Sequence, residues 1–344
     1  MSELAVFEGE TIFGLRSLIL ENRYLRATVL PDAGAKIWQI IYKPLGAKLL
    51  WNNPSIPPSH HKLFAPYDDV WSGGWDELFP VDEAANINGA DYPDHGELWT
   101  GSWDARRFEH PREVGVILKF LTPLSSIEIQ KEIVLREDSC CLEFHHSFRN
   151  VCTKSFPFLW KLHPAFDVTP AHRIDFPPMQ VILEPAFPGT LGGAPQSFQW
   201  PETTIEGRSV DLRSVSKPEE RQLYFFYGTA MDDSWCAITN TANSLACGLR
   251  FDPAVFNSCW LFASYGGWQD YNVAVLEPCT GYPLNFDAMV RAHRHKTLDP
   301  GEVLRTNVIF TAQAGIKSVG SILPDGTIVE SVPVRTPSGR VLQD

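Results

Sequence analysis

The segment SIEIQKEIVL, residues 126–135, alternates from residue 127 to residue 132: isoleucine or lysine stands at the odd-numbered positions, and glutamate or glutamine at the even-numbered ones. In an extended strand Ile127, Ile129 and Lys131 would share one face, and the even-numbered residues between them would share the other. This two-residue period is typical of a half-buried strand in an antiparallel sheet.

Similar short stretches, rich in β-branched and aromatic residues, recur along the whole chain, for example YLRATVL (24–30), GVILKFL (115–121) and VLRTNVIF (303–310). Turn formers separate them, since the chain has 27 prolines and 24 glycines. An open twisted sheet rarely exceeds about 10 strands, so this many strands favours two packed sheets. The sequence predicts an all-β protein, a large antiparallel β-sandwich.

Two segments interrupt the strand pattern, residues 52–102 and residues 184–218, and we expect both to be functional loop systems. No change in composition marks a flexible linker, so we predict one sandwich domain over residues 1–315. For residues 316–344 we predict a C-terminal tail, packed on the domain or extending it. The tail would contain a hairpin whose turn is Asp325-Gly326.

The charge balance limits the classes of partner. The 344 residues include 29 lysines and arginines against 41 aspartates and glutamates, a net charge of -12. This balance disfavours binding to the phosphates of a nucleic acid. The start of the chain lacks the pattern of a signal peptide, no long apolar run suggests a membrane span, and the seven cysteines show no paired spacing. We therefore expect a soluble, cytoplasmic protein, with a periplasmic one as the alternative.

Four stretches place ionisable groups beside turn formers or aromatic residues: SGGWDELFP (72–80), DHGELW (94–99), LWKLHPAF (159–166) and VAVLEPCTGYP (273–283). His163 precedes Pro164, which predicts the end of a strand. Glu277 follows an apolar run and also precedes a proline. Its carboxylate would either cap a strand in water or face a cleft.

In this order the stretches resemble the galactose mutarotase-like superfamily, the aldose 1-epimerases and their relatives. The resemblance spans about residues 15–312 and includes the turn LPDAGAKI (30–37) and the closing strand HKTLDPGEVLRTNVIF (295–310). It implies that HGELW carries the first active-site histidine, His95, and HPAF the second, His163. LEPCTGYP would carry the catalytic glutamate, Glu277.

The chain departs from the best-known galactose epimerases before the first histidine, where GGWDELFP and HGEL replace an Asn-Arg pair and a longer segment. This indicates a divergent branch of the superfamily and leaves the sugar open, including whether it bears phosphate, sulfonate or carboxylate. For the family's substrate-binding aspartate our candidate is Asp211, in SVDLRS.

Interconverting the anomers of an aldose requires a base at the C1 hydroxyl and an acid at the ring oxygen, and no cofactor. An ionised Glu277 is the natural base. His163 would be the acid, because a nearby carboxylate favours its protonated form. His95 would assist by holding the ring oxygen or adjacent hydroxyl groups.

Rigid aromatic rings cover the apolar faces of sugars, carboxylates accept their hydroxyl groups, and arginine binds charged substituents. Each candidate also has a structural alternative: core packing for the tryptophans, support of a loop for the carboxylates near residue 76, and an ion pair for the arginine. The candidate substrate-binding residues are Trp75, Trp99, Trp160, Asp76, Glu77, Arg26 and Asp211.

Other chemistries have weaker support in the sequence. His293 and His295, or the pairs His60-His61 and His145-His146, could contribute to a metal site, but no third ligand has a recognisable spacing. GTLGGAP (189–195) lacks the context of a phosphate loop, and no serine or cysteine lies in a nucleophile motif. We predict no metal and no cofactor.

The leading hypothesis is a cofactor-independent aldose 1-epimerase, a monomer or homodimer whose only predicted partner is a small sugar. The alternatives are a catalytically silent carbohydrate-binding protein on the same fold and a carbohydrate lyase or hydrolase. A hydrolase would need two carboxylates flanking the scissile bond.

Overall fold

The computed structural model describes residues 4–187 and 189–331, which form two large antiparallel sheets. The larger sheet has twelve strands. In spatial order they are β1 (Ala5–Glu8), β2 (Leu18–Glu21), β3 (Leu25–Leu30), β4 (Lys36–Tyr42), β6 (Trp75–Leu78), β14 (Lys161–Asp167), β24 (Asn272–Cys279), β23 (Ser258–Tyr265), β20 (Gln222–Thr229), β16 (Gln180–Leu183) and β17 (Ser197–Gln199), with β5 (Ala47–Lys48) paired to β4.

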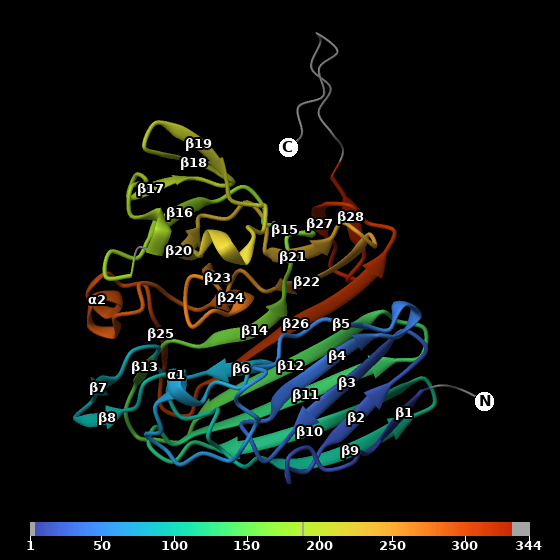
Figure 1. The fold of residues 1–344 in the computed structure, drawn as a ribbon. Coiled ribbons are helices and arrows are strands. Elements are labelled where there is room, and N and C mark those ends of the chain that lie inside the picture. The colour runs from blue at the N-terminus through green and yellow to red at the C-terminus, as the bar shows by residue number, and fades with distance from the viewer. Residues whose placement is uncertain (1–3, 188, 332–344) are drawn as a thin grey trace.

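The smaller sheet has eight strands, in the order β15 (His172–Asp175), β21 (Trp235–Asn240), β22 (Leu245–Phe251), β26 (Val303–Ala314), β12 (Cys141–Asn150), β11 (Ile127–Arg136), β10 (Glu113–Leu121) and β9 (Asp104–His110). In Figure 1 the blue strands β2–β4 overlie the green strands β10–β12, and side chains from both sheets fill one core. The predicted antiparallel β-sandwich is confirmed.

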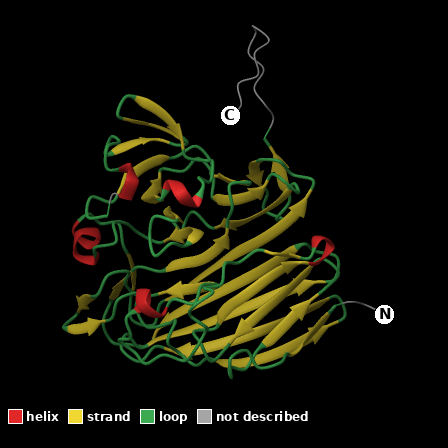
Figure 2. Cartoon of the chain, in the orientation of Figure 1, coloured by secondary structure: helices red, strands yellow, loops and turns green. Residues whose placement is uncertain are grey.

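The remaining elements are short. Four two-stranded antiparallel sheets lie outside the two large sheets: β7 (Ala85–Ile87) with β8 (Ala90–Tyr92), β13 (Phe156–Phe158) with β25 (Lys296–Leu298), β18 (Glu202–Ile205) with β19 (Arg208–Asp211), and β27 (Val319–Ile322) with β28 (Ile328–Glu330). Figure 2 shows how little helix there is: α1 (Tyr67–Val70), α2 (Phe286–Arg291) and the 3₁₀ turns Lys43–Leu45, Gly189–Leu191 and Pro218–Glu220. No helix in the described ranges is long and apolar enough to cross a membrane.

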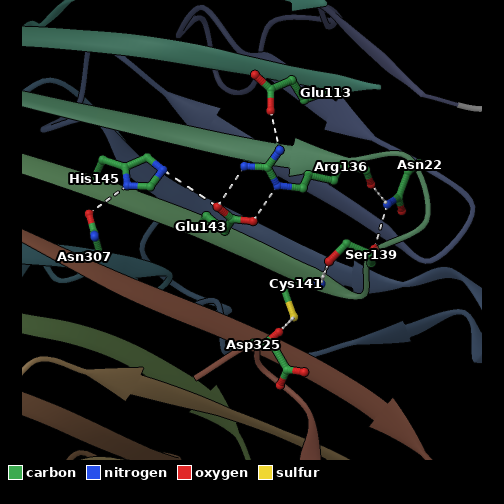
Figure 3. Close-up of polar contacts among 9 residues, drawn as sticks. All are labelled: Asn22, Glu113, Arg136, Ser139, Cys141, Glu143, His145, Asn307 and Asp325. Carbon is green, nitrogen blue, oxygen red and sulfur yellow. Dashed lines mark hydrogen bonds and ion pairs between the residues drawn. The ribbon is translucent and has the colours of Figure 1, made fainter. Parts of the chain in front are cut away.

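The alternating side chains of residues 127–132 lie on β11, where they point in turn into the core and toward solvent. Ile127, Ile129 and Lys131 are buried between the sheets, whereas Glu128 is exposed. Figure 3 shows the opposite, solvent side of this sheet, where Arg136 lies between Glu113 of β10 and Glu143 of β12. The two-residue period therefore identified both faces of the strand.

The tail forms the predicted hairpin, in which β27 pairs with β28 and the Gly326 N–H donates to the Leu323 carbonyl. Its apolar side chains pack with Trp235 and Ala246 of the smaller sheet. Residues 332–344 of the predicted tail lie outside the described residues. The division at residue 315 stays a prediction.

Two segments expected to be loops contain more regular structure than the sequence pattern indicated, and one expectation, the strand end at His163, was wrong. The segment 52–102 contains β6, which pairs in the interior of the larger sheet, and the segment 184–218 contains the short strands β17–β19. His163 does not end a strand, because β14 continues to Asp167. β14 pairs with β24 at Lys161 and again from Ala165 to Asp167, and the interruption between them contains Pro164, which has no N–H to donate.

Candidate active site

A cavity of about 310 Å³ lies on the face of the larger sheet that is turned away from the smaller sheet. Alternation along β6 identifies this face: Trp75 packs on Phe144 of the smaller sheet, so Asp76 points the other way. Three predicted residues from distant parts of the chain line the cavity together, namely His95, His163 and Glu277. The convergence expected from the sequence is therefore present.

Strand register brings Glu277 and His163 together. The register that pairs Lys161 with Cys279 and Ala165 with Val275 sets Glu277 of β24 opposite His163 of β14. On its other side His163 pairs with Asp76 of β6. Directly opposed side chains on one face of an antiparallel sheet are about 5 Å apart at Cβ, so these three polar groups form a row.

Lys161 lies two residues before His163 and on the same face of β14. Its Nζ is 2.6 Å from Oε2 of Glu277 and 2.5 Å from Oδ1 of Asp82. Burial favours the neutral amine, but the charges of Asp82 and Glu277 outweigh it and raise the pKa of Lys161. The site therefore holds a buried ammonium group between two carboxylates.

The carboxyl group of Glu277 is only 1% exposed. Burial raises its pKa to about 7, against the attraction of Lys161, which lowers it. A carboxyl group with such a pKa is matched to proton transfer at neutral pH, since both of its forms are populated there.

His163 is buried, and its Nδ1 lies 3.3 Å from the hydroxyl of Tyr67. Burial, and then the positive charge of Lys161, lower its pKa well below the ordinary value. The expectation that Glu277 would favour protonated His163 is therefore wrong, because burial and the nearby ammonium group of Lys161 both favour the neutral ring.

His95 enters the site from a tight turn. It adopts a left-handed backbone conformation with φ 60°, and its N–H donates to the carbonyl of Asp82. Its ring stacks on Tyr67 with centroids 4.1 Å apart, and its Nδ1 is 2.9 Å from Oδ2 of Asp94. Burial opposes protonation of His95, but the nearby carboxylates Asp94 and Asp82 outweigh it and raise its pKa.

Asp76 does not line the cavity, but it hydrogen-bonds to Tyr67, which does. Its Oδ2 accepts from the Tyr67 hydroxyl at 2.9 Å and from Lys36 at 2.6 Å. Since the Tyr67 proton goes to this carboxylate, the Tyr67 oxygen is free to accept from Nδ1 of His163. Asp76 thus supports Tyr67, which contacts both histidines.

Three predicted sugar-binding residues lie between the sheets and do not reach the cavity. Glu77 is bound there by Lys131 at 3.0 Å, His146 at 3.1 Å and the indole N–H of Trp160 at 3.2 Å. Trp75 packs on Phe144. Their positions follow from the strand period, because Trp75 and Glu77 flank Asp76 in β6 and point into the core.

Three further candidates are also placed away from the cavity lining. Trp99 lies behind Tyr67 with ring centroids 5.0 Å apart. Arg26 of β3 pairs with Glu21 at 3.0 Å, and Asp211 of the β18–β19 hairpin pairs with Arg213 at 2.8 Å. The contacts of Trp99 and Arg26 are those of the structural alternatives, packing and an ion pair; sugar binding by these three residues stays a prediction.

The sequence interpretation missed most of the cavity lining. Lys161 and Asp94 lie inside quoted motifs, and strand alternation could have placed Lys161 beside His163. Much of the aromatic wall and of the acidic rim comes from loops and strands with no distinctive motif; the missed lining residues include Tyr67, Asp68, Asp82, Glu83, Phe225 and Phe262.

In the part of the chain that the structure describes, the His145-His146 pair contacts neighbouring polar side chains instead of a third metal ligand. His145 contacts Asn307 at 2.7 Å, and His146 contacts Glu77. Within residues 4–187 and 189–331, no three His, Cys, Asp or Glu side chains are grouped as ligands.

The fold is that of the galactose mutarotase-like proteins. A candidate aldose 1-epimerase from Klebsiella pneumoniae is 14% identical, with a TM-score of 0.68 over 87% of this chain and 79% of that one. A galactose mutarotase-like protein from Clostridium acetobutylicum is 13% identical, with a TM-score of 0.63 over 91% of this chain and 99% of that one. A galactose mutarotase related enzyme from Lactobacillus acidophilus is 13% identical, with a TM-score of 0.60 over 87% and 97%. No protein-family model and no curated protein sequence matches the chain.

Proposed function

We propose that the protein is a cofactor-independent mutarotase, which interconverts the α and β anomers of an aldose. One observation carries the proposal: Glu277 and His163 lie opposite each other on adjacent strands, and His95 lines the same cavity. The aromatic walls, which include Trp71, Trp268 and Phe262, suit the apolar face of a sugar ring. The structural neighbours named as epimerases and mutarotase-like proteins support the same class of reaction.

In the proposed reaction Glu277 accepts the proton of the C1 hydroxyl while the ring oxygen receives a proton from the histidine pair, and the bond from C1 to O5 breaks. Rotation about the bond from C1 to C2 and reversal of both transfers give the other anomer. His163 was predicted to be the acid. The surroundings raise the pKa of His95 and lower that of His163, which favours His95 as the protonated histidine that supplies the proton. His163 would then hydrogen-bond to the substrate as a neutral ring.

Exchange between anomers, measured by NMR for a panel of aldoses, tests the proposal. We expect the protein to accelerate exchange, and Glu277→Gln to reduce kcat by at least about 100-fold, the contribution of one positioned acid–base group. Glu128→Gln is the matched control, because Glu128 is exposed on the other sheet. Unchanged exchange in Glu277→Gln would refute the assignment of the base.

Two other outcomes would replace the proposal. Tight sugar binding in calorimetry without anomer exchange would indicate a silent carbohydrate-binding protein. Release of a cleaved product would indicate a hydrolase or lyase. Asp82 and Glu277 are the carboxylate pair that a hydrolase would need, but the Lys161 ammonium lies between them.

We also propose that the protein works in the cytoplasm. All seven cysteines are free thiols, as expected for a chain that functions in a reducing compartment.

A further inference from the structure

The cavity has a strong excess of negative charge. Among the described residues that line the cavity, Lys161 is the one lysine, and there is no arginine. The carboxylates in the lining number five: Asp68, Asp82, Glu83, Asp94 and Glu277. A cleft with low-dielectric walls focuses the field of such charges on the ligand.

Lys161 is not available to a substrate anion. Its ammonium group is 3% exposed and lies within 2.6 Å of carboxylate oxygens of both Asp82 and Glu277. Turning it toward a phosphate would leave two buried carboxylates without their cation, which costs more than one new ion pair returns. His95, the other group that can be positive, already lies 2.9 Å from Asp94.

Two carboxylates at the rim of the cavity, Glu83 and Asp68, have no ion pair with a described lysine or arginine. Among the described residues, the one hydrogen-bond donor to the Glu83 carboxylate is the side-chain amide of Asn285, at 3.1 Å. Asp68 has no hydrogen bond or ion pair with any described residue. Asp68 is exposed on its solvent side; its partial burial, and then repulsion from Asp94 and Asp82, raise its pKa despite the attraction of His95. A cation at this position would relieve that repulsion.

Building on the proposed mutarotase activity, we propose that the substrate is an aldose without phosphate, sulfonate or carboxylate, and that an ammonium substituent improves it. The geometry points to Asp68 as the residue at the rim that meets the ammonium group. The preferred order is amino sugar, then neutral sugar, then anionic sugar.

Anomer exchange of matched sugars tests this order in both the gluco and the galacto series. Each series compares the amino sugar, its neutral N-acetyl derivative, the parent hexose and the hexose 6-phosphate, near neutral pH and at low ionic strength. The measured quantity is the enzyme-dependent increase in rate over the spontaneous exchange of each sugar. We expect kcat/KM for the phosphate to be at least about ten-fold below that of the parent hexose, because like charges repel in the cleft. For the amino sugar we expect about a three- to five-fold increase, typical of one ion pair at a solvated rim.

Asp68→Asn identifies the group responsible, and Asp69→Asn is its matched control. Asp69 is the neighbouring exposed carboxylate and does not line the cavity. We expect Asp68→Asn to abolish the preference for the amino sugar, and Asp69→Asn to keep it. High salt should reduce the preference in the unmodified protein, since exposed charges are screened.

The failures are distinguishable. A hexose phosphate that exchanges as fast as its parent would overturn the substrate class while leaving the mutarotase proposal intact. A preference for the amino sugar that survives Asp68→Asn would overturn the role of Asp68. If no sugar in either series exchanged faster with the protein, the proposed function itself would be wrong.

Discussion

At the scale of single residues, the chemistry of the site depends on the contact between Glu277 and Lys161. Burial alone would favour a neutral carboxyl group at Glu277, and the ammonium group 2.6 Å away opposes this. The result is a pKa of about 7. The lysine therefore determines how much of the base is ionised at a given pH.

We predict that kcat/KM falls as the pH decreases through about 7, because Glu277 must be ionised to accept the C1 proton. Lys161→Met should move this acid limb to higher pH, because the positive charge that lowers the pKa of Glu277 is removed. A displacement of one pH unit would reduce activity on the acid limb about ten-fold. The pH dependence of anomer exchange measures both effects.

Lys119→Met is the control for the lysine substitution, since Lys119 is exposed on the smaller sheet. It should leave the acid limb in place. An acid limb that Lys161→Met does not move would show that Glu277 is not the titrating base.

Tyr67 is a positioning residue, since its hydroxyl contacts Asp76 at 2.9 Å and His163 at 3.3 Å while its ring stacks on His95. We predict that Tyr67→Phe lowers kcat by about ten-fold and changes KM little, because the ring remains and only the orientation of His163 is lost. Steady-state kinetics separates the two constants.

Tyr271→Phe is the matched control for this substitution. The Tyr271 hydroxyl accepts from Asn53 at 2.8 Å and contacts neither histidine. Equal losses in the two variants would indicate a general packing effect, not positioning of His163.

At the scale of elements, the turn that carries His95 is held against the strand that carries Asp76. The N–H of Glu97 donates to the carbonyl of Phe79, just beyond the end of β6. Gly96 has φ +70°, and a Cβ atom there would lie 1.9 Å from the Phe79 carbonyl oxygen. Only glycine allows this close approach of the two backbones.

We predict that Gly96→Ala displaces the turn, reduces anomer exchange and lowers the free energy of unfolding by more than about 2 kcal/mol, since a backbone clash adds to the cost of positive φ. Gly89→Ala isolates the cost of positive φ: φ is +88° and no atom lies within 4 Å of the added Cβ. It should cost about 1 kcal/mol. Denaturant unfolding compares the two variants, and equal costs would contradict the proposed clash.

At the scale of the whole molecule, a buried ion pair links the two sheets below the site. Glu77 of β6 lies 3.0 Å from Lys131 of β11 and 3.1 Å from His146 of β12. Burial opposes ionisation of Glu77, but these two groups outweigh it and lower its pKa. Strand alternation points both Glu77 and Lys131 into the core, and their charges are tolerated there because the two side chains pair with each other.

We predict that Glu77→Gln lowers the free energy of unfolding by about 3–5 kcal/mol, because Lys131 would remain buried without its partner. Glu128→Gln, which breaks an exposed contact of 3.8 Å with Arg149, should cost less than about 1 kcal/mol. The pKa of Glu77 is lowered in the folded protein, so ionised Glu77 should stabilise the fold at any pH above the ordinary pKa of a glutamate. This stabilisation should be lost as the pH falls below that ordinary pKa toward the lowered one. A Glu77→Gln protein as stable as the control would show that the pair contributes nothing.

The sequence by itself determined the class of fold and the two faces of its strands. A two-residue period is a local property, so Lys131 could be placed with Ile127 and Ile129 before the structure was known. The ordered motifs also selected Glu277, His163 and His95, which all line the cavity.

Only the tertiary structure decided what surrounds those three residues. The pairing of strands distant in sequence placed Lys161 against Glu277, and burial together with the charge of Lys161 reversed the expected charge preference of His163. The packing of the two sheets enclosed Glu77, Trp75 and Trp160 between them. These outcomes depend on contacts between residues far apart in the sequence, such as Lys161 with Glu277 and Glu77 with Lys131. A local sequence pattern does not contain such contacts, whereas burial and nearby charge set the chemistry of every ionisable group.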